Sequence, residues 1–418
     1  MGHGRLIHSD FKLNLPSFLK DLTLTRIGDG KDNLIAPKIV RMKSKDSERQ
    51  LRELVKKKSI SKLVDNYEEQ LAELLISRDA HLYRASYEVQ KNSIAKLIDD
   101  HYESKQSWQL GSWVYYEWDQ TLLHVLEEDM FFELRTIRNR DLITKEEQEA
   151  LRKFKVGCVG MSVGSSGALA MALSGISQDI KLADGAVISG SNLNRILTGV
   201  DSVGEEKAVA IAKQIYKMNP YLNVQVLSEK LSAKNIERFI DKPEQVNLLV
   251  DEIDDLEMKI RLRVEARKRK IPVIMATELA DTVMLDVERF DLEPDRPLFH
   301  GLIKDAEKLL ENKPANQREW MKHATSIIGT KNVPLRMQQS LLKIGTKIVT
   351  HPQLGSTAMI VGGVLAFAAK NIALGNDLPS QRKSISLEET FLPEHSTRKH
   401  SQQHRRHTKI LKKSLGSM

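Results

Sequence analysis

Residues 159–167 decide the fold, and they read Val159-Gly160-Met161-Ser162-Val163-Gly164-Ser165-Ser166-Gly167. This turn of small residues lies between a predicted β-branched strand, FKVGCVG, and a predicted helix of small residues. A phosphate can approach such a backbone closely, because the helix N-terminus offers free N–H groups and the positive end of its dipole. The same letters fit the GxSxG nucleophile elbow of hydrolases, for which His300 and His351 are candidate bases. The turn alone leaves both interpretations open.

Charged residues further along the chain favour the nucleotide interpretation. Asp184 ends the next predicted strand 24 residues after Gly160, near the spacing at which an acid meets a ribose hydroxyl in dinucleotide folds. Cations and a metal-binding carboxylate around a glycine turn are what a magnesium triphosphate needs, whereas a hydrolase elbow needs none of them. The charged residues that could form this site are Asp184, Arg195 in the loop after it, Lys207, and the acids Asp251, Glu252, Asp254 and Asp255.

Predicted strands and helices alternate from residue 155 to about 279, at the spacing of a parallel, doubly wound sheet. The fold class is therefore α/β, with a Rossmann-like core in residues 135–376. The apolar run Thr357–Ala369 is short for a membrane span, so it predicts a buried helix. Asp254 and its acidic neighbours follow the strand at 247–250, at the carboxyl end where open α/β sheets bind ligands.

The chain before this core has a different pattern. Residues 1–45 are irregular, and steps of three and four between apolar residues predict a helix from Ser47 to about Ile76 and another over 82–98. Residues 1–105 are therefore predicted to be a mainly helical accessory region. Residues 106–134 predict a β-hairpin of Trp113–Trp118 and Thr121–Leu126, which contains an aromatic cluster. That cluster is either a ligand platform or, as base rates favour, a packed face.

The net charge of +8 lies almost entirely at the C-terminus. The last 24 of the 418 residues hold seven Lys or Arg and no acid, and without them the chain has 57 basic and 56 acidic residues. Residues 377–418 are polar and basic, which predicts a disordered tail. The single cysteine, Cys158, excludes a disulfide framework and predicts a buried, inert thiol. With no apolar leader segment, we expect a cytoplasmic protein without a membrane partner.

These residues together resemble the ThiF/MoeB/ubiquitin-activating-enzyme superfamily over about residues 135–375. The family's glycine turn, acid, SNLxRQ segment, GxxK and TDN segment correspond here to GMSVGS, Asp184, SNLNR, GEEK and EIDD. The resemblance implies an ATP- and Mg2+-dependent adenylyltransferase. It would activate the carboxylate of a protein C-terminus, a peptide or a small acid, and it would be a homodimer.

The resemblance also implies a role for each candidate residue. Gly160 and Gly164 would shape the turn near the phosphates, Asp184 would accept from the ribose hydroxyls, Asn192 and Arg195 would contact phosphates, Lys207 would reach the α-phosphate, and Asp254 would bind Mg2+. The segment Ile137–Asp141 (IRNRD) resembles the family's RYxRQ segment, whose second arginine reaches the ATP of a neighbouring subunit. This makes Arg140 the candidate trans arginine, with Arg138 as the alternative.

Several positions depart from the family pattern. Ser162 and Val163 replace glycines, Ala186 replaces the second acid of DxD, Ile196 replaces a glutamine, and the zinc CxxC pairs are absent. Without a suitable cysteine the acyl-adenylate would pass to an external nucleophile. Two other functions stay open. One is a nucleotide-binding scaffold that has lost catalysis, and the other is an RNA-directed activating enzyme whose basic tail contacts phosphates.

Overall fold

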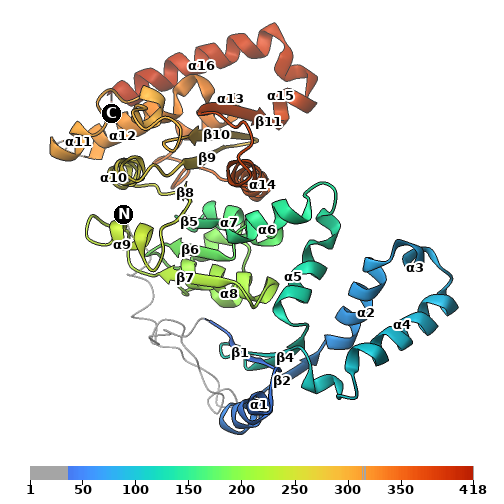
Figure 1. The fold of residues 1–418 in the computed structure, drawn as a ribbon. Coiled ribbons are helices and arrows are strands. Elements are labelled where there is room, and N and C mark those ends of the chain that lie inside the picture. The colour runs from blue at the N-terminus through green and yellow to red at the C-terminus, as the bar shows by residue number, and fades with distance from the viewer. Residues whose placement is uncertain (1–35, 313, 315–316, 418) are drawn as a thin grey trace, which may run out of the picture. The chain divides into compact units, whose positions relative to one another are not determined.

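The computed structural model describes residues 36–312, 314 and 317–417, so most of the irregular segment predicted for residues 1–45 lies outside the described residues. The described chain forms two compact units. The smaller contains residues 36–152 and 215–223, and the larger contains residues 153–214 and 224–417. Figure 1 shows the elements of both.

The smaller unit is built around a four-stranded sheet with the order β1-β3-β4-β2. Its elements are β1 (Lys38–Arg41), α1 (Lys45–Lys57), β2 (Lys62–Asp65), α2 (Tyr67–Arg78), α3 (Ala80–Arg84), α4 (Tyr87–Tyr102), β3 (Ser112–Tyr116), β4 (Thr121–Val125), α5 (Glu128–Thr136) and α6 (Lys145–Lys153). The predicted hairpin is confirmed, because β3 and β4 pair antiparallel. The predicted single helix over 47–76 is wrong, because β2 interrupts it and pairs with β4. Leu63 and Val64 match the helical spacing of apolar residues, but in the structure they lie in β2.

The aromatic residues of the hairpin form a packed core in the smaller unit. The imidazole of His124 is fully buried and stacks on the rings of Tyr67 and Trp113, at centroid distances of 4.7 and 4.3 Å. His124 is also hydrogen-bonded through Nδ1 to Asp65 at 2.9 Å and through Nε2 to the Leu110 carbonyl at 3.0 Å. These contacts identify the cluster as a packed face, the alternative that base rates favoured.

The larger unit contains the predicted doubly wound sheet, in the order β11-β10-β9-β8-β5-β6-β7. Its strands are β5 (Lys155–Val159), β6 (Asp179–Ala183), β7 (Asn223–Leu227), β8 (Leu248–Asp251), β9 (Val273–Leu279), β10 (Thr282–Glu288) and β11 (Gln381–Ser386). The chain runs outward from β5 to β7 and then restarts at β8 on the other side of β5. The strands β6, β5, β8 and β9 are parallel, so the order reverses between β5 and β8. Ligands of open α/β sheets bind at the carboxyl ends of strands beside such a reversal.

Helices cover both faces of this sheet. The helices that lie wholly or partly in the larger unit are α7 (Gly164–Leu173), α8 (Lys207–Met218), α9 (Ile236–Asp241), α10 (Leu256–Lys268), α11 (Lys308–Glu311), α12 (Gln317–Ile328), α13 (Leu335–Leu341), α14 (Gly355–Ala373), α15 (Leu387–Phe391) and α16 (Arg398–Ser417). Figure 1 shows α10 and α14 on opposite sides of β8 and β9. Successive residues of a strand point to opposite faces of the sheet, so Val273 and Met275 of β9 share one face. On that face they pack with residues of α9 and α10 in one apolar cluster.

The helix α14 contains the apolar run that predicted a buried helix. It is long and apolar enough to cross a membrane, but it packs against α7, β9 and β10, and half of its apolar window is buried. Close packing requires small residues, since a Cβ on Gly362 would lie 2.6 Å from the Ser166 carbonyl oxygen of α7. The interpretation as a core helix is confirmed.

The structure of the C-terminal segment differs from the prediction of disorder. Residues 377–418 were predicted to be disordered, yet β11 pairs antiparallel with β10 and α16 packs on α13. Arg382 of β11 binds Asp286 of β10 through Nε and Nη2, at 2.7 and 3.0 Å. Leu411, only 2% exposed, anchors α16. A polar strand and a basic helix are thus held by backbone pairing, an ion pair, side-chain hydrogen bonds and an apolar contact, none of which composition reveals.

Candidate nucleotide site

The glycine turn after β5 lies against the chain that leaves β8. Gly160 has φ +90°, and a Cβ there would lie 2.3 Å from the Glu252 carbonyl oxygen. A Cβ on Gly164 would lie 2.9 Å from the Glu252 Cβ. Both glycines are therefore required by the close approach of these two strand ends at the reversal point. The structure gives them a packing role in addition to the predicted phosphate role.

Gly160→Ala is expected to lower the free energy of unfolding by more than the roughly 1–3 kcal/mol of backbone strain, because the new Cβ also collides with Glu252. Gly190→Ala is the matched control, since nothing lies within 4 Å of its Cβ position. Urea denaturation of both variants measures the difference. Equal midpoints would contradict the proposed close packing.

Asp184 shapes the turn through its carboxylate. One oxygen accepts from the Met161 N–H at 2.7 Å and the other from the Ala186 N–H at 2.8 Å. Because each carboxylate oxygen has two acceptor positions, Asp184 can still accept from a ribose hydroxyl. Lys207 begins α8, and its backbone N–H donates to the Ala186 carbonyl at 2.9 Å. The segments that carry Asp184 and Lys207 are thus joined through Ala186.

Arg195 connects the SNLNR loop to the glycine turn. Its Nε donates to the Ser162 hydroxyl at 3.1 Å, and its Nη1 donates to Asn194 Oδ1 at 2.9 Å. Burial lowers the pKa of Arg195 from its usual value, while the nearby carboxylates of Glu278 and Asp254 act to raise it. Arg195 is therefore a half-buried cation among the ends of β5, β8 and β9, where an anion interacts with it more strongly than in water.

Asn192 is buried and holds the loop in shape. Its Oδ1 accepts from the Ser189 N–H at 3.1 Å, which closes the short 3-10 helix Gly190–Asn192. The loop is also joined to α14, because Asn194 Nδ2 donates to the Gln353 carbonyl at 3.0 Å. A Cβ on Gly355 would lie 2.2 Å from the Asn194 carbonyl oxygen. The structure thus brings the loop to the start of α14, which the sequence analysis did not predict.

Glu278 is a site residue that the sequence analysis missed. It lies near the end of β9, its carboxylate accepts from the Leu354 N–H, and burial raises its pKa. An acid at the carboxyl end of a predicted parallel strand is the signal that selected Asp254, and it could have selected Glu278 as well.

Asp254 is exposed, and Asp255 instead caps α10 by accepting from the Met258 N–H at 3.2 Å.

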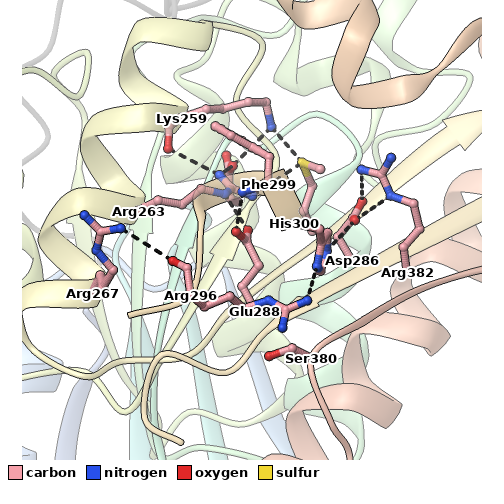
Figure 2. A network of polar contacts seen from close by, with 12 residues as sticks. Lys259, Arg263, Arg267, Asp286, Glu288, Arg296, Phe299, His300, Ser380 and Arg382 are labelled. Atoms are coloured by element: carbon pink, nitrogen blue, oxygen red, sulfur yellow. Dashed lines mark hydrogen bonds and ion pairs between the residues drawn. The ribbon is translucent and has the colours of Figure 1, made fainter. Parts of the chain in front are cut away.

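The acidic run after β8 rests on a buried network, shown in Figure 2. The fully buried Arg263 of α10 binds Asp251 at the end of β8 and Glu288 of β10, the latter at 2.5 Å. Although burial would raise the pKa of Asp251, Lys259 and Arg263 outweigh it and hold that pKa below its usual value. Asp251 also accepts from the Ile253 N–H at 3.2 Å. This bond folds the loop that presents Asp254.

The ring of Phe299 packs against the guanidinium of Arg263, with 4.1 Å between the ring centroid and the guanidinium carbon. Phe299 donates its backbone N–H to Glu288 at 2.7 Å, and it has φ +52°, a left-handed conformation that costs free energy for this residue type. His300 is bonded to Asp286 and Arg296 at 2.9 Å each. Among the described residues no histidine hydrogen-bonds Ser162, and the two candidate bases, His300 and His351, are bonded to other residues, which disfavours the hydrolase elbow.

Glu252 lies between the glycine turn and β9. Its Oε1 accepts from the Ala276 N–H at 2.7 Å, and burial raises the pKa of this carboxyl to about 8. At neutral pH the group is therefore mostly protonated. It adds little negative charge beneath the turn, which suits the binding of an anion there.

Stability should depend on pH through Glu252. The folded chain keeps this proton up to about pH 8, whereas the unfolded chain loses it near pH 4.3, so the free energy of unfolding falls as pH rises between these values. The slope is about 1.4 kcal/mol per pH unit at most. Glu252→Gln should flatten the profile and be more stable than the parent chain at pH 8. The exposed Glu237→Gln control should keep the parent profile, and identical profiles for all three proteins would contradict this.

The donor set suits a bound magnesium triphosphate. In the described part of the chain, no group of three or more His, Cys, Asp or Glu is arranged to hold a metal ion. Mg2+ commonly takes one or two carboxylates and completes its shell with waters and substrate phosphates, so the exposed Asp254 fits this use.

Cys158 is fully buried and burial raises its pKa, which confirms the predicted buried thiol.

Comparison with known proteins identifies the class to which this sheet and its site belong. The model of the ThiF family matches residues 135–409, so the chain belongs to the ThiF family. Uncharacterized protein MT1398 of Mycobacterium tuberculosis is 35% identical over 277 residues, which are 66% of this chain and 38% of that protein. A probable molybdopterin-synthase adenylyltransferase of Porphyra purpurea is 35% identical over 115 residues, which are 27% of this chain and 29% of that protein.

The matched regions span well under half the length of either relative. Among solved structures, Escherichia coli tRNA N6-threonylcarbamoyladenosine dehydratase, TcdA, is similar with a TM-score of 0.42 and 19% identity. That similarity covers 58% of this chain and 95% of TcdA.

Proposed function

We propose that the chain is an ATP- and Mg2+-dependent adenylyltransferase that activates a carboxylate. The observation that carries the proposal is the half-buried Arg195, held by Ser162 of the glycine turn and close to Asp254 and Glu278 at the neighbouring strand ends. Membership of the ThiF family and the 35% identity to an algal protein named as a probable adenylyltransferase support it. We expect the reaction to take place in the cytoplasm.

In this proposal the chain's own residues position and neutralise the triphosphate. A substrate carboxylate oxygen attacks the α-phosphorus, the bond from that phosphorus to the bridging oxygen breaks, and pyrophosphate leaves. Arg195 and Asn192 bind phosphate oxygens, and Lys207 stabilises the negative charge that grows on the α-phosphate. Asp254 would hold Mg2+, which supplies further positive charge to the leaving pyrophosphate. Asp184 orients the ribose.

Isotope exchange between ATP and pyrophosphate tests the proposal, with peptides that end in glycine and small acids offered as substrates. Exchange should require the acid, and Lys207→Met should reduce the rate by about 100-fold or more. Binding of ATP without exchange for any acid would reject the enzymatic function and support the alternative, a nucleotide-binding scaffold that has lost catalysis. No binding and no exchange would reject both.

We also propose a homodimer in which Arg140 acts on the partner's ATP. Within the smaller unit Arg140 donates to Glu133 at 2.8 Å and is exposed, so it can exchange this contact for a phosphate. Mixing an inactive Arg140→Met variant with an inactive Lys207→Met variant should restore exchange, because mixed dimers contain one intact site. Failure of this complementation, with dimers confirmed by sedimentation, would reject the trans role.

A further inference from the structure

A polar cavity lies at the outer edge of the sheet, among elements that follow the nucleotide site in the chain. Its volume is about 380 Å³. The lining residues come from β10 and β11 (Thr282, Ser384, Ser386), from the chain at the start of α13 (Lys331, Asn332, Pro334, Leu335), from α15 and the turn after it (Glu388, Glu389, His395), and from α16 (His400, Ser401, His404, Arg405). None of these residues belongs to the candidate nucleotide site.

The walls of the cavity are held in place by specific contacts. The buried Gln338 of α13 donates through Nε2 to Thr408 of α16 at 2.9 Å, and His404 Nε2 lies 2.9 Å from the Val333 carbonyl oxygen. On the other side, Ser386 of β11 pairs with Thr282 of β10 in the sheet register. Ser384 and Ser386 are two residues apart on one strand and so share a face. The cavity is therefore bounded by a sheet edge and a fixed helix.

The lining offers cations without partners. Lys331 and Arg405 are exposed, and neither forms an ion pair or a side-chain hydrogen bond with another described residue. The ring of His400 lies near that of His395, with centroids 4.3 Å apart, and an imidazole can donate a hydrogen bond to an anion. His395 itself faces Glu388 and Glu394, at 3.6 and 3.8 Å. The first turn of the 20-residue helix α16 adds the positive end of its dipole beside His400 and Ser401. This wall of the cavity therefore suits an anion.

Other residues of the lining suit hydroxyl groups. Thr282, Ser384 and Ser386 provide hydroxyls that donate and accept. Of the two carboxylates, Glu388 lies 3.6 Å from His395 Nδ1, whereas Glu389 is exposed and forms no ion pair with another described residue. A free carboxylate in the lining disfavours a ligand that is anionic throughout, but it binds ligand hydroxyls well. The cavity is also much larger than one oxyanion needs.

We propose that this cavity binds a small hydroxylated phosphomonoester, of the size of a sugar phosphate. The phosphate would contact Arg405, Lys331 and His400. The ligand hydroxyls would bind Glu389 and the serines of β11. The proposal rests only on these residues, and it stands whether or not the chain adenylates a carboxylate.

Calorimetric titration of the full chain with ribose 5-phosphate tests this, with ribose and inorganic phosphate as partial ligands. Ribose 5-phosphate should bind more tightly than either part, and saturating ATP should not compete. Arg405→Gln should weaken binding by about tenfold, since a charge-assisted contact is lost. Arg406→Gln is the matched control, because it is the next exposed arginine of α16 and does not line the cavity.

Three results would overturn the proposal. The first is no binding of ribose 5-phosphate at millimolar concentration. The second is equal affinity in the Arg405→Gln and Arg406→Gln variants. The third is loss of ribose 5-phosphate binding in the presence of ATP or in Arg195→Met, which would assign the ligand to the nucleotide site. Tighter binding of inorganic phosphate than of ribose 5-phosphate would also reject the predicted role of Glu389.

Discussion

Arg263→Met is expected to lower the free energy of unfolding by about 3–5 kcal/mol, the usual cost of removing one partner of a buried ion pair. Arg263 is fully buried, and its guanidinium binds both Asp251 and Glu288. Figure 2 shows Arg263 beside Glu288. Without it, among the described residues, the Glu288 carboxylate still accepts from the Phe299 N–H, and Asp251 still contacts Lys259 and the Ile253 N–H, at 3.2 Å each. Methionine preserves the apolar volume of the side chain. The decrease in the free energy of unfolding would therefore come mainly from the two buried carboxylates that have lost their arginine.

Arg261→Met provides the matched control on the same helix. Arg261 pairs with Glu257 one turn away at 2.8 Å and is partly exposed, so its loss should cost no more than about 0.5 kcal/mol. Urea denaturation of both variants gives the comparison. Adding Glu288→Gln to Arg263→Met should recover part of the stability. Equal effects of the two arginine substitutions would show that the buried network is not needed to hold β8, α10 and β10 together.

Arg195→Met is expected to weaken ATP binding and to slow pyrophosphate exchange by about 100-fold or more, the usual cost of removing one preorganised donor from developing negative charge. Burial lowers the pKa of this arginine, which shows that it lies where solvent screens charge poorly. Its contacts with Ser162 and Asn194 fix its direction before ATP arrives. Both features make its interaction with phosphate strong.

Arg195→Lys separates charge from geometry. Lysine keeps one positive charge but has no fork of donors, so Ser162 and a phosphate cannot both be bound in the same way. We expect an intermediate loss for this variant, in ATP affinity measured by calorimetry and in exchange rate. If Arg195→Met binds ATP as tightly as the parent chain, the site lies elsewhere.

Local patterns in the sequence predicted the core of the larger unit. The alternation of strands and helices, the glycine turn and the apolar helix predicted over Thr357–Ala369 all depend on neighbours within a few residues, and the structure extends that helix to Gly355–Ala373. The order of Asp184, Arg195, Lys207 and Asp254 predicted which strand ends matter. In the structure Asp254 lies near enough to Arg195 to act on the pKa of that arginine, and Asp184 and Lys207 lie on segments joined through Ala186.

Contacts between distant segments could not be predicted in this way. Asp286 of β10 meets Arg382 of β11 across 96 residues, and Glu278 meets Leu354 across 76. The C-terminal helix was missed for a related reason. Its inward positions include His404, Thr408 and Leu411. Two of these three are polar, and they meet Val333 and Gln338 only when the helix packs on α13 and the chain before it.

Calorimetric titration of the full chain with ATP in the presence of Mg2+ tests the central claim most directly. We predict one ATP bound per chain, with affinity that falls in Arg195→Met and Asp254→Asn and stays unchanged in Arg261→Met. Absence of binding, or equal affinity in all four proteins, would contradict a nucleotide site at the carboxyl ends of β5 and β8.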